Sequence, residues 1–297
     1  MRVGVAGLGR MGAVLAHRLL DAGHEVSVWN GSAGPVAELT ERGAAAAGSP
    51  ADLATAVDVV VVLVHDDAAV RRVWLAGDGL LAGAVAGTLL VESSTVRVDT
   101  VRQVAAAAAA VGAAVVDAPV SGTVAPARAG QLLGLAGGTA ADVARAAPVL
   151  DVWCRRVVHL GPLGAGMATK LALNMGMAAM WAALGESYAL AGAHGVDRAA
   201  FTAVLTDSPL ASPSVLGKAA LLAADTVPTE QVPTFDVAGV RKDLVAMVAT
   251  AVGAGVPAAV AAAALAQFSG AVTAGFGPAD LVAVADYLRD ASAPTGG

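Results

Sequence analysis

The chain carries one isolated lysine in a long apolar segment. Lys170 is the only charged residue between Pro162 and Gly185. Desolvation lowers the pKa of an ammonium, so we expect Lys170 to take a proton in its neutral form and return one in its charged form. Asn174 lies four residues later, on the same face of a helix, where its amide can hydrogen-bond a bound molecule or orient the ammonium. The alternatives are a lysine that extends from a buried helix to solvent and a satisfied core amide.

A glycine-rich segment near the N-terminus predicts a second kind of chemistry. The residues Gly7, Leu8, Gly9, Arg10, Met11 and Gly12 match GxGxxG between a strand-like and a helix-like run. In this motif the first glycine permits a tight turn, the second lets a pyrophosphate approach the backbone, and the third lets the helix pack against the strand. We therefore predict dinucleotide binding here, the alternative being a glycine turn that only packs.

The end of the second strand-like run indicates which dinucleotide binds. NAD enzymes usually carry Asp or Glu roughly 20 residues beyond the glycines, where it accepts from the ribose 2'-hydroxyl. This chain has Asn30, Gly31 and Ser32 there. Without a carboxylate to repel a 2'-phosphate, NADP is the preferred cofactor and NAD is possible. Asn30, Ser32 and Arg10 can contact that phosphate, although position 31 has no arginine.

A further polar segment follows an apolar run. Ser121, Gly122 and Thr123 come after the run that contains Ala114–Asp117. Ligands of open parallel sheets bind beyond the carboxyl ends of the strands. The hydroxyl and amide groups of this segment are therefore predicted to hold a small carboxylate-bearing substrate.

The pattern of elements predicts how these residues are positioned. Short apolar runs alternate with helix-like segments as far as about Gly161, and helix-like segments alone follow. The first pattern is typical of a mostly parallel sheet covered on both faces. We predict an α/β Rossmann domain over residues 1–161, a buried interdomain helix over 162–193, an all-helical domain over 194–290 and a flexible tail over 291–297.

Composition excludes several classes of protein. Hydrophobic residues make up 57% and charged residues 14%, but aromatic residues are only 3%, and the uncharged stretch Leu244–Ala279 contains seven Gly and Pro residues, so we expect no membrane span. The net charge of -6 with scattered basic residues argues against nucleic acid. The single Cys154 and a start without signal-peptide features favour the cytoplasm. The five histidines have no metal-ligand spacing.

Four segments, taken in order, carry a family resemblance. They are the glycine loop at 7–12; Asp117-Ala118-Pro119-Val120-Ser121-Gly122 with Gly130; Gly161-Pro162-Leu163-Gly164-Ala165-Gly166 leading to Lys170 and Asn174; and Phe235 with Lys242-Asp243. Together they resemble the β-hydroxyacid dehydrogenase family of the 6-phosphogluconate dehydrogenase superfamily, over nearly the whole chain. Its members include 3-hydroxyisobutyrate dehydrogenase and tartronate semialdehyde reductase.

The resemblance implies roles for further residues. Lys170 matches the lysine that the family uses for proton transfer, and Lys242 the one that reaches toward the cofactor. Thr95 corresponds to a strand-end segment near the nicotinamide. His65, which follows Val64, occupies the place where relatives commonly carry proline. There it can touch the ribose of the cofactor, the alternative being a solvated loop histidine.

The resemblance implies an NADP-preferring oxidoreductase that interconverts a small β-hydroxy acid and its semialdehyde, with Lys170 as general acid and base. Thr123 stands where the family usually has a second glycine, which leaves the substrate open. One alternative is an imine reductase of the same superfamily, although those enzymes generally have Asp or Tyr in place of Lys170. The other is a non-catalytic dinucleotide-binding scaffold. The apolar helix around Lys170 predicts a homo-oligomer, either a dimer or a tetramer.

Overall fold

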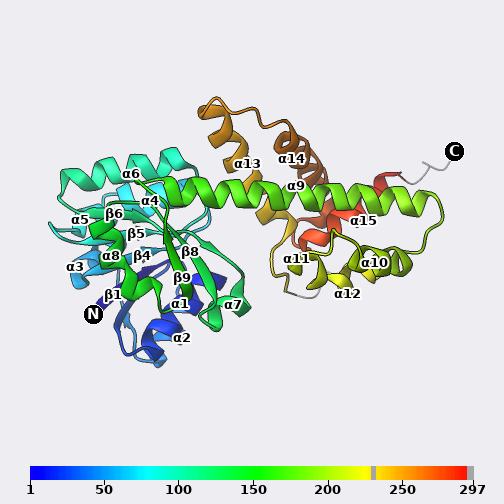
Figure 1. Cartoon of the computed structure of the whole chain (residues 1–297). Helices are drawn as coiled ribbons and strands as arrows, with labels where there is room; N and C mark the ends of the chain where they lie inside the picture. The colour runs from blue at the N-terminus through cyan, green and yellow to red at the C-terminus, as the bar shows by residue number, and fades with distance from the viewer. Residues whose placement is uncertain (229–231, 293–297) are drawn as a thin grey trace. The chain divides into compact units, whose positions relative to one another are not determined.

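The computed structural model describes residues 1–228 and 232–292 of the chain (Figure 1). The chain divides into two compact units, Met1–Ala172 and Leu173–Gly297. Each unit is described separately below. Of the tail predicted at 291–297, Ala291 and Ser292 belong to the last helix and the other residues lie outside the described ones.

A six-stranded parallel sheet forms the centre of unit 1, which confirms the α/β prediction. Its strands follow the order β3-β2-β1-β4-β5-β6, the order of the Rossmann fold. The strands are β1 (Arg2–Ala6), β2 (Glu25–Trp29), β3 (Ala45–Ala46), β4 (Val59–Val62), β5 (Leu89–Glu92) and β6 (Ala114–Asp117). The two-residue β3 is too short to leave an apolar run, and the sequence analysis does not predict it.

Helices cover both faces of this sheet. Val3, Val5 and Val61 point toward one face, where they pack in a single buried cluster with Leu15 of α1 and Val143 of α8. On the opposite face a side chain at Gly4 would meet Leu53 of α3. The helices are α1 (Arg10–Asp21), α2 (Gly34–Glu41), α3 (Pro50–Ala56), α4 (Asp67–Leu75), α5 (Leu80–Gly83), α6 (Val98–Ala110), α7 (Val124–Arg128) and α8 (Ala140–Leu150).

Unit 1 also contains a three-stranded sheet that the sequence pattern does not predict. Strand β7 (Val120–Ser121) pairs antiparallel with β8 (Leu132–Ala136), which pairs parallel with β9 (Cys154–His159). The last strand carries two exposed arginines rather than an apolar run. Cys154 is buried at its start, and burial raises the pKa of this thiol to about 12.

A continuous helix of 29 residues, α9 (Ala165–Ala193), begins in unit 1 and ends in unit 2 (Figure 1). Within the single chain this helix is not buried on every face, and burial of its exposed side chains in a subunit interface stays a prediction. Leu173 is 50% exposed and Leu190 is 65% exposed. Its sequence is apolar all round because most of its residues are small and uncharged, and such a sequence does not reveal which face a neighbouring element covers.

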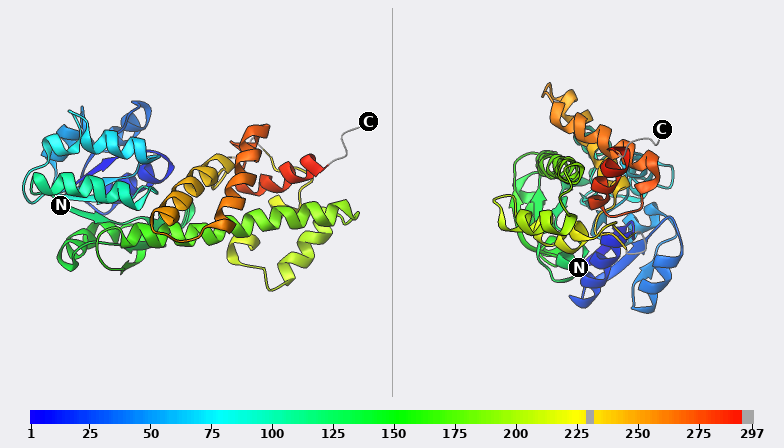
Figure 2. Two further views of the ribbon diagram at one scale, coloured as in Figure 1. Left: turned by 90° about the horizontal axis from the view of Figure 1, so that it is seen from above. Right: turned by 90° about the vertical axis from the view of Figure 1, so that its right-hand side faces the viewer.

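The rest of unit 2 is helical, as predicted. Its helices are α10 (Arg198–Asp207), α11 (Pro213–Leu216), α12 (Ala219–Ala223), α13 (Val237–Gly253), α14 (Ala259–Ala271) and α15 (Val284–Ser292), with a π-helical turn at Val272–Phe276 and a 3-10 turn at Leu281–Ala283. Helices α13 and α14 pack against each other (Figure 2). The sequence pattern predicts one helix over Ser214–Ala224, whereas the structure has two short helices, α11 and α12, which are separated at Gly217 and Lys218.

One stretch of unit 2 meets simple criteria for a membrane-spanning helix. Among the described residues, Ala259–Phe276 alone is long and apolar enough, by length and composition, and 22% of it is buried within the chain. Its last turn departs from regular helix at Gly275, where φ is +93°.

Candidate active site

The glycine loop between β1 and α1 has the geometry that a dinucleotide requires. Gly7 has φ +97°, and a Cβ there would lie 2.1 Å from the Leu63 carbonyl oxygen. A Cβ on Gly12 would lie 2.0 Å from the Gly7 carbonyl oxygen, so only glycine lets helix α1 approach its own loop. A Cβ on Gly9, by contrast, would meet no atom within 4 Å. The loop is thus tight where it folds and open at Gly9, where a pyrophosphate would approach the N-terminus of α1.

The other residues predicted in this loop are placed around that opening. Leu8 is buried, Met11 is half-buried, and Arg10 is exposed as the first residue of α1. The loop also lies at the point where the strand order reverses, because β1 pairs with β2 on one side and β4 on the other. Open parallel sheets bind their ligands at this point. The residues present therefore fit a dinucleotide.

The end of β2 is tied to the glycine loop. The Asn30 Oδ1 atom accepts a hydrogen bond from the Leu8 backbone N–H at 2.9 Å. The Asn30 Nδ2 atom donates to the Ser32 carbonyl oxygen at 3.1 Å and to Ser32 Oγ at 2.9 Å. Gly31 and Ser32 are exposed, and a Cβ on Gly31 would meet no atom within 4 Å. This turn therefore presents small, uncharged groups where the ribose is read.

The loops after β4 and β5 are joined to each other. The half-buried Val64 donates its backbone N–H to Ser94 Oγ at 2.9 Å. His65 is exposed and Thr95 is half-buried in the same two loops. The structure thus brings Val64, His65 and Thr95 to one edge of the sheet, the edge at which the glycine loop also lies.

A buried carboxyl group supports these loops. The Glu92 side chain is fully buried at the end of β5, where Oε2 accepts from the Trp74 indole N–H at 2.9 Å and Oε1 accepts from the Ser94 backbone N–H at 2.8 Å. Burial, together with a smaller effect of the nearby Asp117 carboxyl, raises the pKa of Glu92 to about 7, in spite of the hydrogen bonds from Ser94 and Trp74.

The predicted substrate segment begins in β7. Ser121 is half-buried and pairs with Leu133, whereas Gly122 and Thr123 are exposed. Gly122 has φ +130°, and a Cβ there would lie 2.4 Å from Leu132 Cδ2, so this turn requires glycine. Thr123 precedes α7, and its side chain makes no capping hydrogen bond to that helix. The three residues thus form a turn at the surface of unit 1.

Lys170 lies in the part of α9 that belongs to unit 1. It is half-buried, one turn beyond the start of the helix. The helix start is fixed by Asp117, whose carboxylate accepts from the backbone N–H groups of Gly164 at 2.7 Å and Met167 at 2.6 Å. Unit 1 therefore holds the glycine loop, the Ser121 turn and the proton-transfer candidate.

Unit 2 holds the remaining two candidates. Asn174 is buried and donates from Nδ2 to Asp243 Oδ2 at 3.2 Å. The Lys242 Nζ atom lies 2.7 Å from the other oxygen of Asp243, Oδ1. The Asp243 carboxylate thus links the predicted Asn174 to the predicted Lys242.

A small cavity adjoins this group in unit 2. Asn174 and Asp243 line it together with Trp181 and Phe235. The Trp181 indole N–H is buried and has no hydrogen-bond partner among the described residues. Sequence reasoning misses Trp181, because a tryptophan inside an apolar helix carries no signal that separates it from core.

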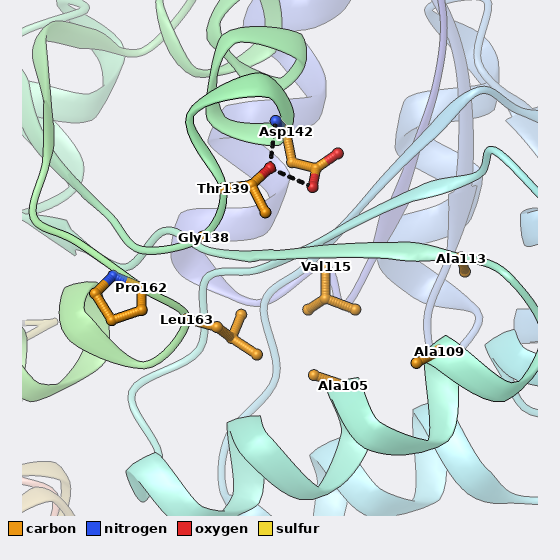
Figure 3. A pocket seen from close by; sticks show the side chains of 9 residues that line it. All are labelled: Ala105, Ala109, Ala113, Val115, Gly138, Thr139, Asp142, Pro162 and Leu163. Carbon is orange, nitrogen blue, oxygen red and sulfur yellow. Dashed lines mark hydrogen bonds between the residues drawn. The ribbon is translucent and has the colours of Figure 1, made fainter.

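A second pocket, in unit 1, carries no comparable chemistry (Figure 3). Alanines of α6, among them Ala105 and Ala109, form one wall, and the start of α8 forms another. Its polar groups are bonded to each other, since Thr139 Oγ1 accepts from the Asp142 N–H at 3.1 Å and donates to Asp142 Oδ2 at 2.7 Å. Within residues 1–228 and 232–292 there is also no cluster of three metal-ligating side chains.

Two buried acids are missed as functional candidates by sequence reasoning. Glu92 and Asp117 are register partners at the ends of β5 and β6. A signal for both was present, because each closes an apolar run with a carboxylate, at Leu89–Glu92 and at Ala114–Asp117. A charged residue at the end of a buried strand lies at the edge of the sheet where ligands bind.

Family models match both parts of the chain. The model described as the NAD binding domain of 6-phosphogluconate dehydrogenase matches residues 2–161. The model described as the NAD-binding domain of NADP-dependent 3-hydroxyisobutyrate dehydrogenase matches residues 164–288.

Individual proteins agree with these matches. A 3-hydroxyisobutyrate dehydrogenase of Pseudomonas aeruginosa is 40% identical over 202 residues, which is 68% of each chain. Glyoxylate/succinic semialdehyde reductase 1 of Arabidopsis thaliana is 32% identical over 97% of this chain and 99% of its own. The solved structure of a Mycobacterium tuberculosis 3-hydroxyisobutyrate dehydrogenase with L-serine has a TM-score of 0.84 at 29% identity, covering 97% of this chain and 99% of that one. Together with the two-unit fold and the glycine loop, these matches show that the chain belongs to the β-hydroxyacid dehydrogenase family of NAD(P)-dependent oxidoreductases.

Proposed function

We propose that the protein interconverts a small β-hydroxy acid and its semialdehyde, with Lys170 as general acid and base. The observation that carries the proposal is the location of Lys170, half-buried one turn into α9, in the same unit as the glycine loop and the Ser121 turn. A bound nicotinamide supplies the group that accepts or delivers hydride at the reacting carbon.

The chemistry of the chain's own residues then follows. In oxidation, neutral Lys170 Nζ takes the proton of the substrate hydroxyl as the C–H bond breaks and the carbonyl forms. In reduction, the Lys170 ammonium returns that proton to the carbonyl oxygen. The Ser121 hydroxyl and the backbone N–H groups of the turn hold the substrate carboxylate, and Thr123 adds a further hydroxyl to that turn. Asn174, whose Nδ2 is held by Asp243, is proposed to bind substrate through its amide.

NADP is the proposed preferred cofactor. The turn Asn30–Ser32 presents no carboxylate to a 2'-phosphate, and the space beside Gly31 is open. The description of the matching C-terminal family, which names an NADP-dependent enzyme, supports the same preference.

The decisive experiment is the Lys170→Ala variant. We expect turnover of a small semialdehyde with NADPH to fall by about 100-fold or more, the low end of general acid-base contributions, while the Kd for NADPH changes little. Retained turnover would reject the role of Lys170. A panel of small semialdehydes, hydroxy acids and imines, each assayed with NADPH and NADH, separates the proposed reaction from imine reduction, and no turnover of any of them would favour a scaffold.

We also propose that the chain forms a homo-oligomer through unit 2. Exposed apolar side chains occur on several of its helices, at Leu190, Val204, Val252 and Val260. An exposed apolar surface that is larger than single scattered residues usually marks an interface, and these side chains are the candidates for one. Light scattering at micromolar concentration should give at least twice the mass of one chain, 28.8 kDa, and a monomer would contradict the proposal.

A further inference from the structure

The start of α9 is held by a single side chain from the sheet. Asp117, at the carboxyl end of β6, is fully buried. Its Oδ1 atom accepts from the Gly164 N–H at 2.7 Å, and its Oδ2 atom accepts from the Met167 N–H at 2.6 Å. These two groups belong to the four N–H groups that have no partner inside a helix at its N-terminus. A carboxylate there also interacts favourably with the helix dipole.

The surroundings leave this carboxylate almost no freedom. A Cβ on Gly137 would lie 2.4 Å from Asp117 Oδ1, and a Cβ on Gly166 would lie 2.2 Å from the Leu135 carbonyl oxygen and 3.0 Å from Asp117 Oδ2. Glycine at these two positions therefore allows β8, Asp117 and the first turn of α9 to approach one another. Burial raises the pKa of Asp117, although the N–H groups of Gly164 and Met167 oppose that shift.

The main chain of Asp117 is also held by hydrogen bonds, and it leads to the Ser121 turn. Its N–H donates to the Gly137 carbonyl oxygen at 3.0 Å, and its carbonyl oxygen accepts from the Gly137 N–H at 2.8 Å. Four residues later the chain reaches Ser121 in β7, which pairs with Leu133 of β8. One residue thus joins two parts of unit 1: its backbone leads to the Ser121 turn, and its side chain holds the helix turn that precedes Lys170.

We infer that Asp117 is a positioning residue, which sets where Lys170 lies relative to the Ser121 turn by fixing the first turn of α9. Lys170 follows Met167 by three residues, so a shift or rotation of the first turn moves the ammonium with it. Misplacing a reacting group by about 1 Å can cost on the order of 100-fold in rate. This inference rests on the proposed role of Lys170.

The test is the variant Asp117→Asn, which keeps the size of the side chain but turns an NH2 group toward one of the two backbone N–H donors. We expect kcat to fall by about 10- to 100-fold, with a smaller change in the substrate KM and the NADPH Kd within about 2-fold. The control is Ser49→Ala, at the start of another helix of unit 1, α3. Ser49 Oγ accepts a hydrogen bond from the Asp52 backbone N–H at 3.0 Å, and this variant removes that acceptor. That variant should retain wild-type kcat.

The double variant separates positioning from a general loss of structure. If Asp117 acts through Lys170, adding Asp117→Asn to Lys170→Ala should change the residual turnover by less than about 3-fold. Additive losses would overturn the inference, as would wild-type kcat in Asp117→Asn. If Asp117→Asn is insoluble, Asp117→Ser is measured in its place, and failure of both to fold would assign Asp117 to stability and overturn the inference. Wild-type turnover in Lys170→Ala, by contrast, would reject the proposed function itself.

Discussion

The buried carboxylates of unit 1 accept hydrogen bonds from backbone and indole N–H groups, whereas those of unit 2 lie beside cationic side chains. In unit 1, Glu92 is bound by Trp74 and Ser94, and Asp117 by the first turn of α9. In unit 2, three acids pair with cations across the described residues: Asp243 with Lys242, Asp280 with Lys218, and Asp286 with Arg198.

The architecture of each unit explains the difference. At the carboxyl edge of a parallel sheet, loops and helix N-termini converge and offer N–H groups that have no partner of their own. A helical unit uses nearly all its backbone donors inside its helices, so a buried acid there is left to pair with a cationic side chain. The two kinds of partner have different consequences, because only the second neutralises the charge.

The largest effect is expected from breaking a pair in unit 2. Asp286 lies beside Arg198 and also accepts from the Val227 N–H at 2.8 Å. Asp286→Ala leaves the Arg198 charge and that N–H without their partner, which should cost about 3–5 kcal/mol in the free energy of unfolding. Urea unfolding checks this, with Asp290→Ala, an exposed acid of the same helix, as the control. Equal losses in the free energy of unfolding of both variants would contradict the dependence of buried acids in unit 2 on their cationic partners.

The next effect is a pH dependence that belongs to unit 1. The pKa of Glu92 is about 7 in the folded chain and about 4.5 for an ordinary Glu, so between these values the folded state holds a proton that the unfolded state has lost. The contribution of Glu92 is therefore present below about pH 4.5 and is lost as the pH rises to about 7, by roughly 3 kcal/mol at most. Chemical unfolding of wild type and Glu92→Gln from pH 4.5 to 8 should show a steeper decline in wild type. Parallel curves of unfolding free energy against pH for the two proteins would refute the contribution of Glu92.

The smallest effect concerns a charge added at a strand end of unit 1. Asn30→Asp retains the acceptor for the Leu8 N–H and adds a carboxylate that repels a 2'-phosphate. We expect the Kd for NADPH to rise about 10-fold, equivalent to 1.4 kcal/mol, with little change for NADH. Gly31→Arg, at a position with open space, should lower the Kd for NADPH instead. Titration of protein fluorescence with each cofactor measures both, and a tighter NADPH complex in Asn30→Asp would reject the proposed preference.

The sequence predicts the sheet of unit 1 well because its strands are short apolar runs between helices. It misses β8, although Leu132–Ala136 is apolar throughout, and it misses β9, because the two exposed arginines of Cys154–His159 do not resemble a buried strand. In unit 2 the break between α11 and α12 is also missed. Lys218 lies at this break and bonds to Asp280, 62 residues away, a contact that no local pattern contains.

The candidate site residues also divide into those that a local sequence pattern predicts and those that it does not. Those set by local geometry are visible in the sequence, as the glycine loop and the turn at Gly122 show. Those set by contacts between distant segments are not. Asn174 is a good candidate from its spacing to Lys170, but its bond to Asp243, 69 residues later, depends on how α9 packs against α13.

The burial of Cys154 has a practical consequence for measuring motion. Because its pKa is raised to about 12, only a minute fraction of this thiol is the reactive thiolate at neutral pH. It is also the only cysteine in the sequence. A cysteine introduced at an exposed polar position, such as Asp290 in unit 2, would accept a fluorescent maleimide selectively with the native residue left in place. The chain is thus ready for single-site labelling, which would allow movements of unit 2 to be followed in solution as cofactor is added.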